Sequence, residues 1–191
     1  MIEQLYKVLC RDRDGSRLVS CNGGHQEWTP GIKVKAKGPL VPCVNGIHLC
    51  REKDLLHWLN DVICPVRRVS RERIVCDDKI VARWAIIGEP LETWSDRAAR
   101  LFACDCAEWA LALNEQPDPR SVEAVRVARL YAVGEATSEE LNAARSAARN
   151  AADAARSAAG AADAAWSAAW NAAMAYMTER LSEYLAGKEK P

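Results

Sequence analysis

Three residues with metal-binding or nucleophilic side chains lie within eight positions of one another: Cys43, His48 and Cys50. Thiolates and imidazoles bind zinc and also serve as nucleophile and base in catalysis. A structural zinc site needs four such ligands, usually in two closely spaced pairs, and the sequence contains no Cys-x-x-Cys pair. Cys64 or Cys76 could complete a set. We nevertheless expect no metal, and we interpret these thiols as buried side chains beside a hydrogen-bonded histidine.

His48 also supports an alternative, enzymatic function. The segment Ile47-His48-Leu49 is predicted to end a strand that a helix follows, and it resembles the histidine strand of ADP-ribosyltransferase-like folds. In that family the histidine holds the nicotinamide ribose, and a catalytic glutamate is also required. Glu89 and Glu92 follow the last predicted strand but form no assignable pattern. We therefore keep an ADP-ribosyltransferase-like or nucleotide-binding module as the alternative, and assign no catalytic residue and no cofactor.

Other chemical motifs are missing from the sequence. It has no Gly-rich phosphate loop, nucleophile elbow, HExxH motif or paired-carboxylate motif. A basic cluster from Arg67 to Arg73 could bind phosphates, but no aromatic residue is interleaved with it, and Asp77 and Asp78 follow. The formal net charge is zero and the pI is near 6.8, so no global field attracts polyanions. We expect neither nucleic acid nor a membrane as partner.

The stretch from Ala143 to Ala175 dominates the C-terminal half, because nineteen of its thirty-three residues are alanine. Its larger residues recur every three or four positions, which predicts a helix with one distinct stripe. The stripe is polar between Ser146 and Asp163 and then becomes large and apolar. Its apolar members are Trp166, Trp170, Met174 and Met177. We expect these four to form a protein-interaction surface, covered by the chain's own elements, by a dimer mate or by a target protein.

Capping signals bound this helix. Thr137 and Glu140 form a capping box at its start, and Gly187 marks its end. The intervening fifty or so residues would extend roughly 75 Å as one straight helix. Gly160 alone is a weak breaker, so we favour one long helix and keep a break at Gly160 as the alternative.

A change in composition near Trp94 predicts two domains. Six of the eight cysteines precede it, and the chain after it is rich in Ala, Arg, Glu and Leu. We predict an α+β fold, with a small antiparallel-sheet module and one helix over residues 1–92 and an alanine-rich helical bundle over residues 93–191. In the first module we expect a hairpin around Asp14-Gly15, strands at Ile32–Ala36, Ile47–Cys50, Ile74–Cys76 and Ile80–Ile87, a helix over Lys53–Val62 and a basic loop over 67–73. In the second we expect helices over 93–114 and from Pro119 to Gly134, ahead of the alanine tract.

The N-terminus suggests a cytoplasmic protein. Residues 1–4 lack the basic and apolar regions of a signal peptide, and charged residues in the alanine tract argue against a membrane span. In that compartment we expect all eight cysteines to be reduced.

Two stretches resemble known families. The run Arg97–Glu108, followed by Pro117–Ala124 and an alanine helix with periodic tryptophans, is similar to the C-terminal part of bacterial and phage chains labelled as immunity proteins. The N-terminal stretch, with Tyr6-Lys7-Val8, Gly46–Cys50 and Asp78–Val81, resembles an uncharacterised small domain often joined to such helices. The resemblance implies a non-enzymatic protein that binds another protein, or itself as a homodimer through the alanine-rich helix, in phage–bacterial conflict.

Overall fold

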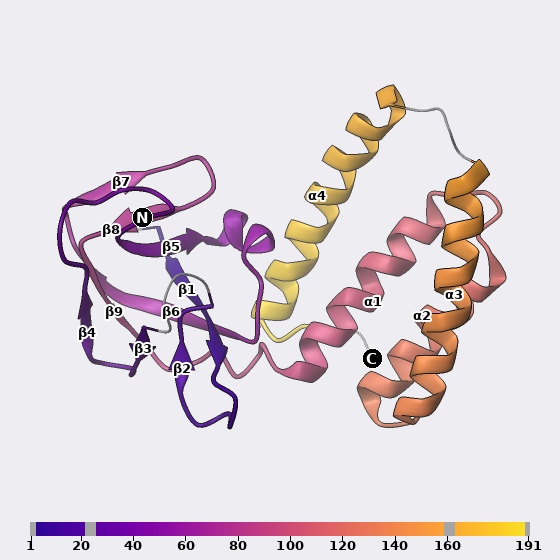
Figure 1. Ribbon diagram of the computed structural model, residues 1–191, viewed down its shortest axis with the longest axis horizontal. Coiled ribbons are helices and arrows are strands. Elements are labelled where there is room, and N and C mark those ends of the chain that lie inside the picture. The colour runs from indigo at the N-terminus through magenta and orange to yellow at the C-terminus, as the bar shows by residue number, and fades with distance from the viewer. Residues whose placement is uncertain (1–2, 22–25, 159–162, 190–191) are drawn as a thin grey trace. The chain divides into compact units, whose positions relative to one another are not determined.

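The computed structural model describes residues 3–21, 26–158 and 163–189, with the backbone alone described for residues 150–158 and 163–169 (Figure 1). Contacts between Cα atoms divide the chain into two compact units, Met1–Ser95 and Asp96–Pro191. We call them the N-terminal unit and the helical unit, and each is described by itself. The described strands all lie in the first and the described α-helices in the second. The predicted α+β fold class is therefore confirmed.

The described residues of the N-terminal unit form nine strands in one antiparallel sheet. The strands are β1 (Leu5–Arg11), β2 (Leu18–Val19), β3 (Glu27–Trp28), β4 (Lys33–Lys35), β5 (Ile47–Arg51), β6 (Val62–Val69), β7 (Arg73–Val75), β8 (Ile80–Ala82) and β9 (Trp84–Ile87). Their order is β4-β9-β6-β1-β5-β8-β7, with β2 and β3 attached to β1. Strands β8 and β9 are separated only by Arg83 but lie near opposite ends of this order, so the sheet curls back on itself like a small barrel.

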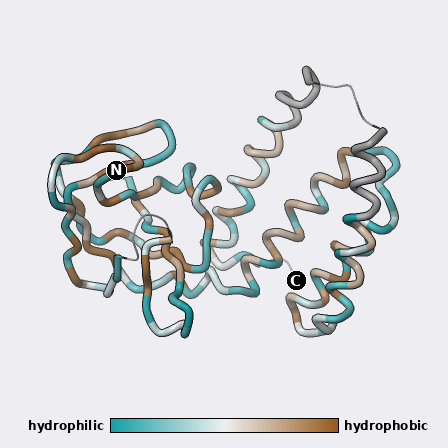
Figure 2. The backbone as a smooth tube through the Cα atoms, viewed as in Figure 1, coloured by the Kyte–Doolittle hydropathy of each residue, from teal (hydrophilic) through white to brown (hydrophobic). Residues whose placement is uncertain are grey.

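One face of the curled sheet forms the core. Leu5 and Leu9 of β1 point to this face, and Trp28 packs on it. Lys7 lies between the two leucines in the same alternation, with its Nζ 5.4 Å from the centroid of the Trp28 ring. Burial lowers the pKa of Lys7 to about 8 because the apolar surroundings disfavour the ammonium. Figure 2 shows hydrophobic segments running through these strands.

The segment after β5 differs from the predicted helix over Lys53–Val62. A short 3₁₀-helix, η1 (Glu52–His57), takes its place, and Val62 begins β6. Leu55 does anchor η1, because it is fully buried. However, β-branched residues pack well in strands, and Ile63 pairs with Val8 of β1 instead of extending the helix.

The basic stretch 67–73, predicted as a loop, is largely strand. Arg67 and Arg68 lie in β6, which ends at Val69, and Arg73 begins β7. A bulge between Val66 and Arg68 shifts the register of β6 against β9, which removes the strict alternation that would have marked a strand in the sequence. The single strand predicted over Ile80–Ile87 is wrong, because it is broken at Arg83 into β8, which pairs with β5 and β7, and β9, which pairs with β4 and β6. The other predicted strands are present, and β3 was not predicted.

Local capping signals in the helical unit are confirmed. The helices are α1 (Asp96–Ala112), α2 (Pro119–Val133), α3 (Ser138–Ala158) and α4 (Asp163–Leu185). The Asp118 carboxylate accepts a hydrogen bond of 2.8 Å from the amide of Arg120 at the start of α2. Thr137 and Glu140 exchange the reciprocal hydrogen bonds of a capping box, of 2.8 and 3.2 Å.

The described residues of the alanine tract form two helices, α3 and α4, and the expected continuity of one long helix falls on residues 159–162, outside the described residues. Helix α3 packs on α2, whereas α4 packs on α1 (Figure 1). An alanine-rich helix buries little area per residue, and α3 and α4 each bury apolar area by packing on another helix of the same unit. Gly160 lies outside the described residues. Among the described helices, none is both long and apolar enough to cross a membrane.

Candidate functional site

His48 closes a tight turn rather than gathering ligands. Its Nε2 accepts a hydrogen bond of 3.1 Å from the backbone amide of Cys43, which has a left-handed φ of 64°. The imidazole also bonds to the backbone at Gly46, but burial and the charges of Lys7 and Lys79 lower the pKa of His48. The neutral imidazole hydrogen-bonds to the backbone at Cys43 and at Gly46, and it thereby stabilises the turn between them.

The thiols near His48 do not combine into a site. Cys43 is exposed, so its expected burial is wrong, whereas Cys50 is buried as expected. Burial raises the pKa of Cys50 to about 12, so its thiol stays protonated at neutral pH. Within the described residues, no group of three or more His, Cys, Asp or Glu side chains is arranged to hold a metal ion. His48, Cys43 and Cys50, the candidate ligand residues, thus have structural roles in a turn and in the core, and the nucleotide-binding alternative centred on His48 stays a prediction.

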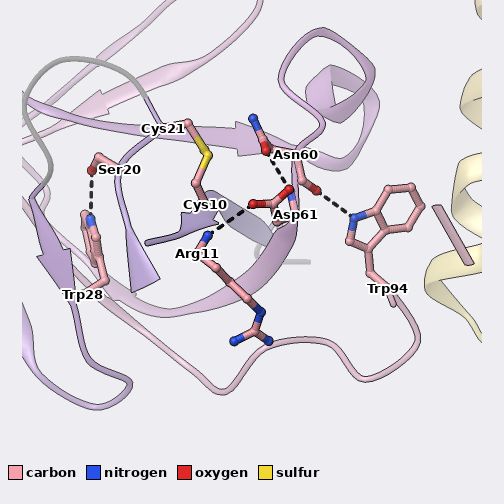
Figure 3. The surroundings of a disulfide bond; sticks show 8 residues. All are labelled: Cys10, Arg11, Ser20, Cys21, Trp28, Asn60, Asp61 and Trp94. Atoms are coloured by element: carbon pink, nitrogen blue, oxygen red, sulfur yellow. Dashed lines mark hydrogen bonds between the residues drawn. A yellow bond between two sulfur atoms is a disulfide. The ribbon is translucent and has the colours of Figure 1, made fainter. Parts of the chain in front are cut away.

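A disulfide joins Cys10 and Cys21 (Figure 3), so the prediction that all eight cysteines are reduced is wrong. The hairpin pairs Cys10 with Val19 and thereby brings the Cα atoms of the two cysteines to 5.1 Å, within the range that a disulfide spans. The expectation of reduced cysteines was based on the predicted compartment, which carries no information on which cysteines the fold brings together. In the same region, Trp28 Nε1 donates a 3.0 Å hydrogen bond to Ser20 Oγ.

The predicted interaction stripe on α4 becomes progressively buried toward its C-terminal end. The side chain of Trp170 is 50% exposed, Met174 and Met177 are partly buried, and Leu181, the next position of the stripe, is 1% exposed. Helix α1 covers the buried end, where Tyr176 stacks on Trp109 with ring centroids 5.2 Å apart. The side chain of Trp166 lies outside the described residues. Among the members of the stripe whose side chains are described, Trp170 is the most exposed.

A buried ionic cluster around Asp105 joins α1, α2 and α4. Asp105 of α1 accepts a hydrogen bond of 2.6 Å from Arg129 Nη2 of α2. Its other oxygen accepts from Arg180 Nε and from the Tyr184 hydroxyl, at 3.0 Å for the latter. Asp105 and Arg180 are each only 4% exposed. Burial alone would raise the pKa of Asp105, but the hydrogen bonds from these three partners outweigh it and lower the pKa.

Sequence reasoning did not identify this cluster, because its members are far apart in the chain and each has an ordinary local context. Arg180 lies 75 positions from Asp105. The one available signal was an aspartate at a buried position of an amphipathic helix, since an unpaired buried carboxylate is costly and implies a cationic partner.

A groove of about 620 Å³ lies across α1, α2 and α3. Its floor and walls are mostly small or apolar, with Ala103, Ala107, Ala124, Ala128, Val125 and Leu141 among the lining residues. Two cations, Arg100 and Arg145, also line it. The Arg100 guanidinium lies 4.9 Å from the centroid of the Tyr131 ring. Alanines allow a bound backbone to approach closely, and the arginines can pair with acidic groups.

No protein-family model matches the chain, and neither the curated proteins nor the solved structures that were compared contain a match. The resemblance to immunity-type proteins therefore depends only on the residues quoted for it. The residues of this chain alone must support a functional proposal.

Proposed function

We propose that this chain is a non-enzymatic binding protein whose helical unit holds a helix of a partner protein in the groove across α1, α2 and α3. The groove itself is the observation that supports the proposal most strongly. Its volume of about 620 Å³ is comparable to that of other ligand-binding clefts. The family resemblance suggests phage–bacterial conflict as the setting, and this setting is part of the proposal.

The groove lining indicates the chemistry of the partner. Helix-in-groove recognition uses an amphipathic helix whose apolar face enters a hydrophobic groove. Among the groove-lining residues the charged side chains are Arg100 and Arg145, so the partner helix should carry acidic residues beside its apolar face. The alanines of α1 and α2 leave space for a closely approaching backbone, as small residues do at other helix contacts.

Site-specific photo-crosslinking in the native host tests the proposal. A photoreactive amino acid would replace Ala103, which lines the groove, or Ala110, which is exposed on the same helix but does not line it. We expect position 103 to capture one partner protein that position 110 does not capture. The peptide identified at the crosslink should be an acidic amphipathic helix.

Charge-reversal variants test the groove by their affinity for the partner peptide identified at the crosslink. Arg145→Glu changes a groove residue, whereas Arg149→Glu changes an exposed residue one turn further along α3. We expect the first variant to weaken binding at least tenfold, because it places like charges together, and the second to have little effect. Equal effects of both variants would refute the groove as the binding site.

A second copy of this chain is the other expected occupant, through the alanine-rich helices or the groove. Light-scattering mass distinguishes it, because a dimer would dissociate in Arg145→Glu. A stable monomer that shows no position-specific crosslink would contradict both forms of the proposal.

A further inference from the structure

Strands β4, β9 and β6 lie side by side in the sheet (Figure 1). Their outer face carries cationic side chains beside an aromatic ring. Lys33 and Lys35 of β4 are exposed, while Val34 between them packs on the core. The register places Ile86 of β9 opposite both Lys33 and Arg68, and places Trp84 opposite Lys35. We call these five residues, Lys33, Lys35, Arg68, Trp84 and Ile86, the basic sheet face.

The positive charge of this face is largely uncompensated. The Glu72 carboxylate interacts electrostatically with Lys35, but it is bound to Arg83 through Nε at 3.0 Å and through Nη2. Among the described residues, Lys33, Lys35 and Arg68 have no ion pair with a carboxylate. Beside the face, Lys35, Lys37 and Arg83 line a hollow of about 530 Å³. Strands β4 and β6 therefore present cations that no carboxylate pairs with to any polyanion that approaches them.

Protection of the sheet edge explains only part of this pattern. Lysines on an edge strand discourage pairing with other chains, and β4 is an edge strand. Arg68 and Trp84, however, belong to β6 and β9, which are paired on both sides. Trp84 is partly exposed, and Lys33 Nζ lies 4.4 Å from its ring centroid. The face thus combines a flat aromatic surface with cations on neighbouring strands.

We propose that the basic sheet face binds single-stranded nucleic acid, with Lys33, Lys35 and Arg68 contacting phosphates and Trp84 stacking on one base. Cationic grooves with aromatic platforms are the usual means of binding single strands, and a duplex would hide the base faces that Trp84 requires. Lysines at alternate positions of a β-strand are about 6.6–6.8 Å apart, which is similar to the spacing of successive phosphates in an extended single strand of nucleic acid. The proposal is independent of the helical groove.

The structure thereby changes an expectation drawn from the sequence. The basic stretch 67–73 has no aromatic residue within it, and this was the argument against nucleic acid. The tryptophan comes instead from β9, which is remote in sequence and adjacent in the sheet.

Fluorescence anisotropy of the full chain with labelled oligo(dT) and oligo(U) tests the proposal. Binding should weaken as salt rises from about 50 to 200 mM. Lys33→Ala/Lys35→Ala/Arg68→Ala should lower affinity at least tenfold and reduce the slope of log K against log salt by about 2, or roughly 0.7 for each lost phosphate contact. The control Arg13→Ala/Lys53→Ala/Arg149→Ala makes the same change in net charge at exposed positions elsewhere and should leave both quantities nearly unchanged.

Trp84→Ala should lower affinity roughly tenfold with little change in salt slope, since base stacking is worth about 1–3 kcal/mol per base. Trp84→Phe should retain most of the affinity, which separates stacking from loss of fold, and circular dichroism checks the folding of each variant. Absence of binding at the lowest salt, or equal losses in both triple variants, would overturn the proposal. It would also be overturned if poly-glutamate or anionic vesicles competed as well as unlabelled oligonucleotide.

Discussion

Replacing Asp105 by asparagine should strongly destabilise the helical unit. The carboxylate is 4% exposed and binds Arg129, Arg180 and Tyr184. The neutral amide would remove the buried countercharge of Arg180 and leave it only the partly exposed carboxylate of Glu183, and breaking a buried pair in this way costs about 3–5 kcal/mol. The unit spans Asp96–Pro191, and at about 0.05–0.15 kcal/mol per residue its total stability is only about 5–14 kcal/mol. The variant should therefore lose roughly a fifth or more of that stability.

Urea denaturation followed by circular dichroism at the helix band measures this loss. Glu123→Gln is the matched control, because Glu123 forms an exposed pair with Arg126 on α2 and its removal should change the free energy of unfolding by no more than about 0.5 kcal/mol. A loss below 1 kcal/mol for Asp105→Asn, or equal losses for the two variants, would refute the reasoning.

The difference in the free energy of unfolding between wild type and Asp105→Asn should also depend on pH, which gives an independent check. The cluster lowers the pKa of Asp105 in the folded state, whereas an unfolded aspartate titrates near 3.9. The stabilisation is therefore fully present above the unfolded pKa and is lost as pH falls through the lower folded pKa. The stability difference between wild type and Asp105→Asn should be constant from about pH 5 to 7 and should shrink below about pH 4. A difference that persists undiminished through the acid range would contradict the role of the ionised carboxylate.

Three further predictions concern single features of the two units. Cys10→Ser/Cys21→Ser should lower the free energy of unfolding of the N-terminal unit by roughly 3 kcal/mol, the loop-closure value for a separation of 11 residues; unchanged urea midpoints with and without reductant would contradict the disulfide. Trp170→Ala should lower the stability of the helical unit by only about 1–2 kcal/mol in thermal melts, since half of the side chain is exposed; a loss of about 3–5 kcal/mol would indicate a fully buried ring. Lys7→Met should stabilise the N-terminal unit by about 1–3 kcal/mol at pH 7, because the folded pKa of Lys7 is lowered to about 8. This gain in the free energy of unfolding should shrink as pH rises from 8 toward about 10.4. Urea titrations of Lys7→Met and of the exposed control Lys53→Met test it, and equal effects of the two variants would contradict the prediction.

Local chemistry explains why much of the secondary structure could be predicted. The Asp14-Gly15 turn, the Asp118 cap and the Thr137–Glu140 capping box each act within a few residues, and each occurs as expected. Their signals are encoded where the backbone needs them. Predictions that depended on such signals were accordingly reliable.

Features that depend on distant partners could not be predicted in this way. Ile63 belongs to a strand because β1 pairs with it, and Asp105 is buried because Arg180 reaches it across 75 positions. The basic sheet face likewise takes Arg68 and Trp84 from strands that the sequence separates. In each case the deciding interaction appears only when the elements are assembled.

The cluster around Asp105 also links stability to the proposed function of the helical unit. Arg100, Ala103 and Ala107 of α1 line the groove, while Asp105 on the same helix holds Arg129 of α2. The cluster therefore fixes the position of α1 against α2, and hence the width of the groove, without contacting a bound helix. At a temperature where Asp105→Asn is still folded, its affinity for the partner peptide should fall, because part of the binding energy would be spent on restoring the groove. Unchanged affinity in the folded variant would show that the groove keeps its shape without the cluster.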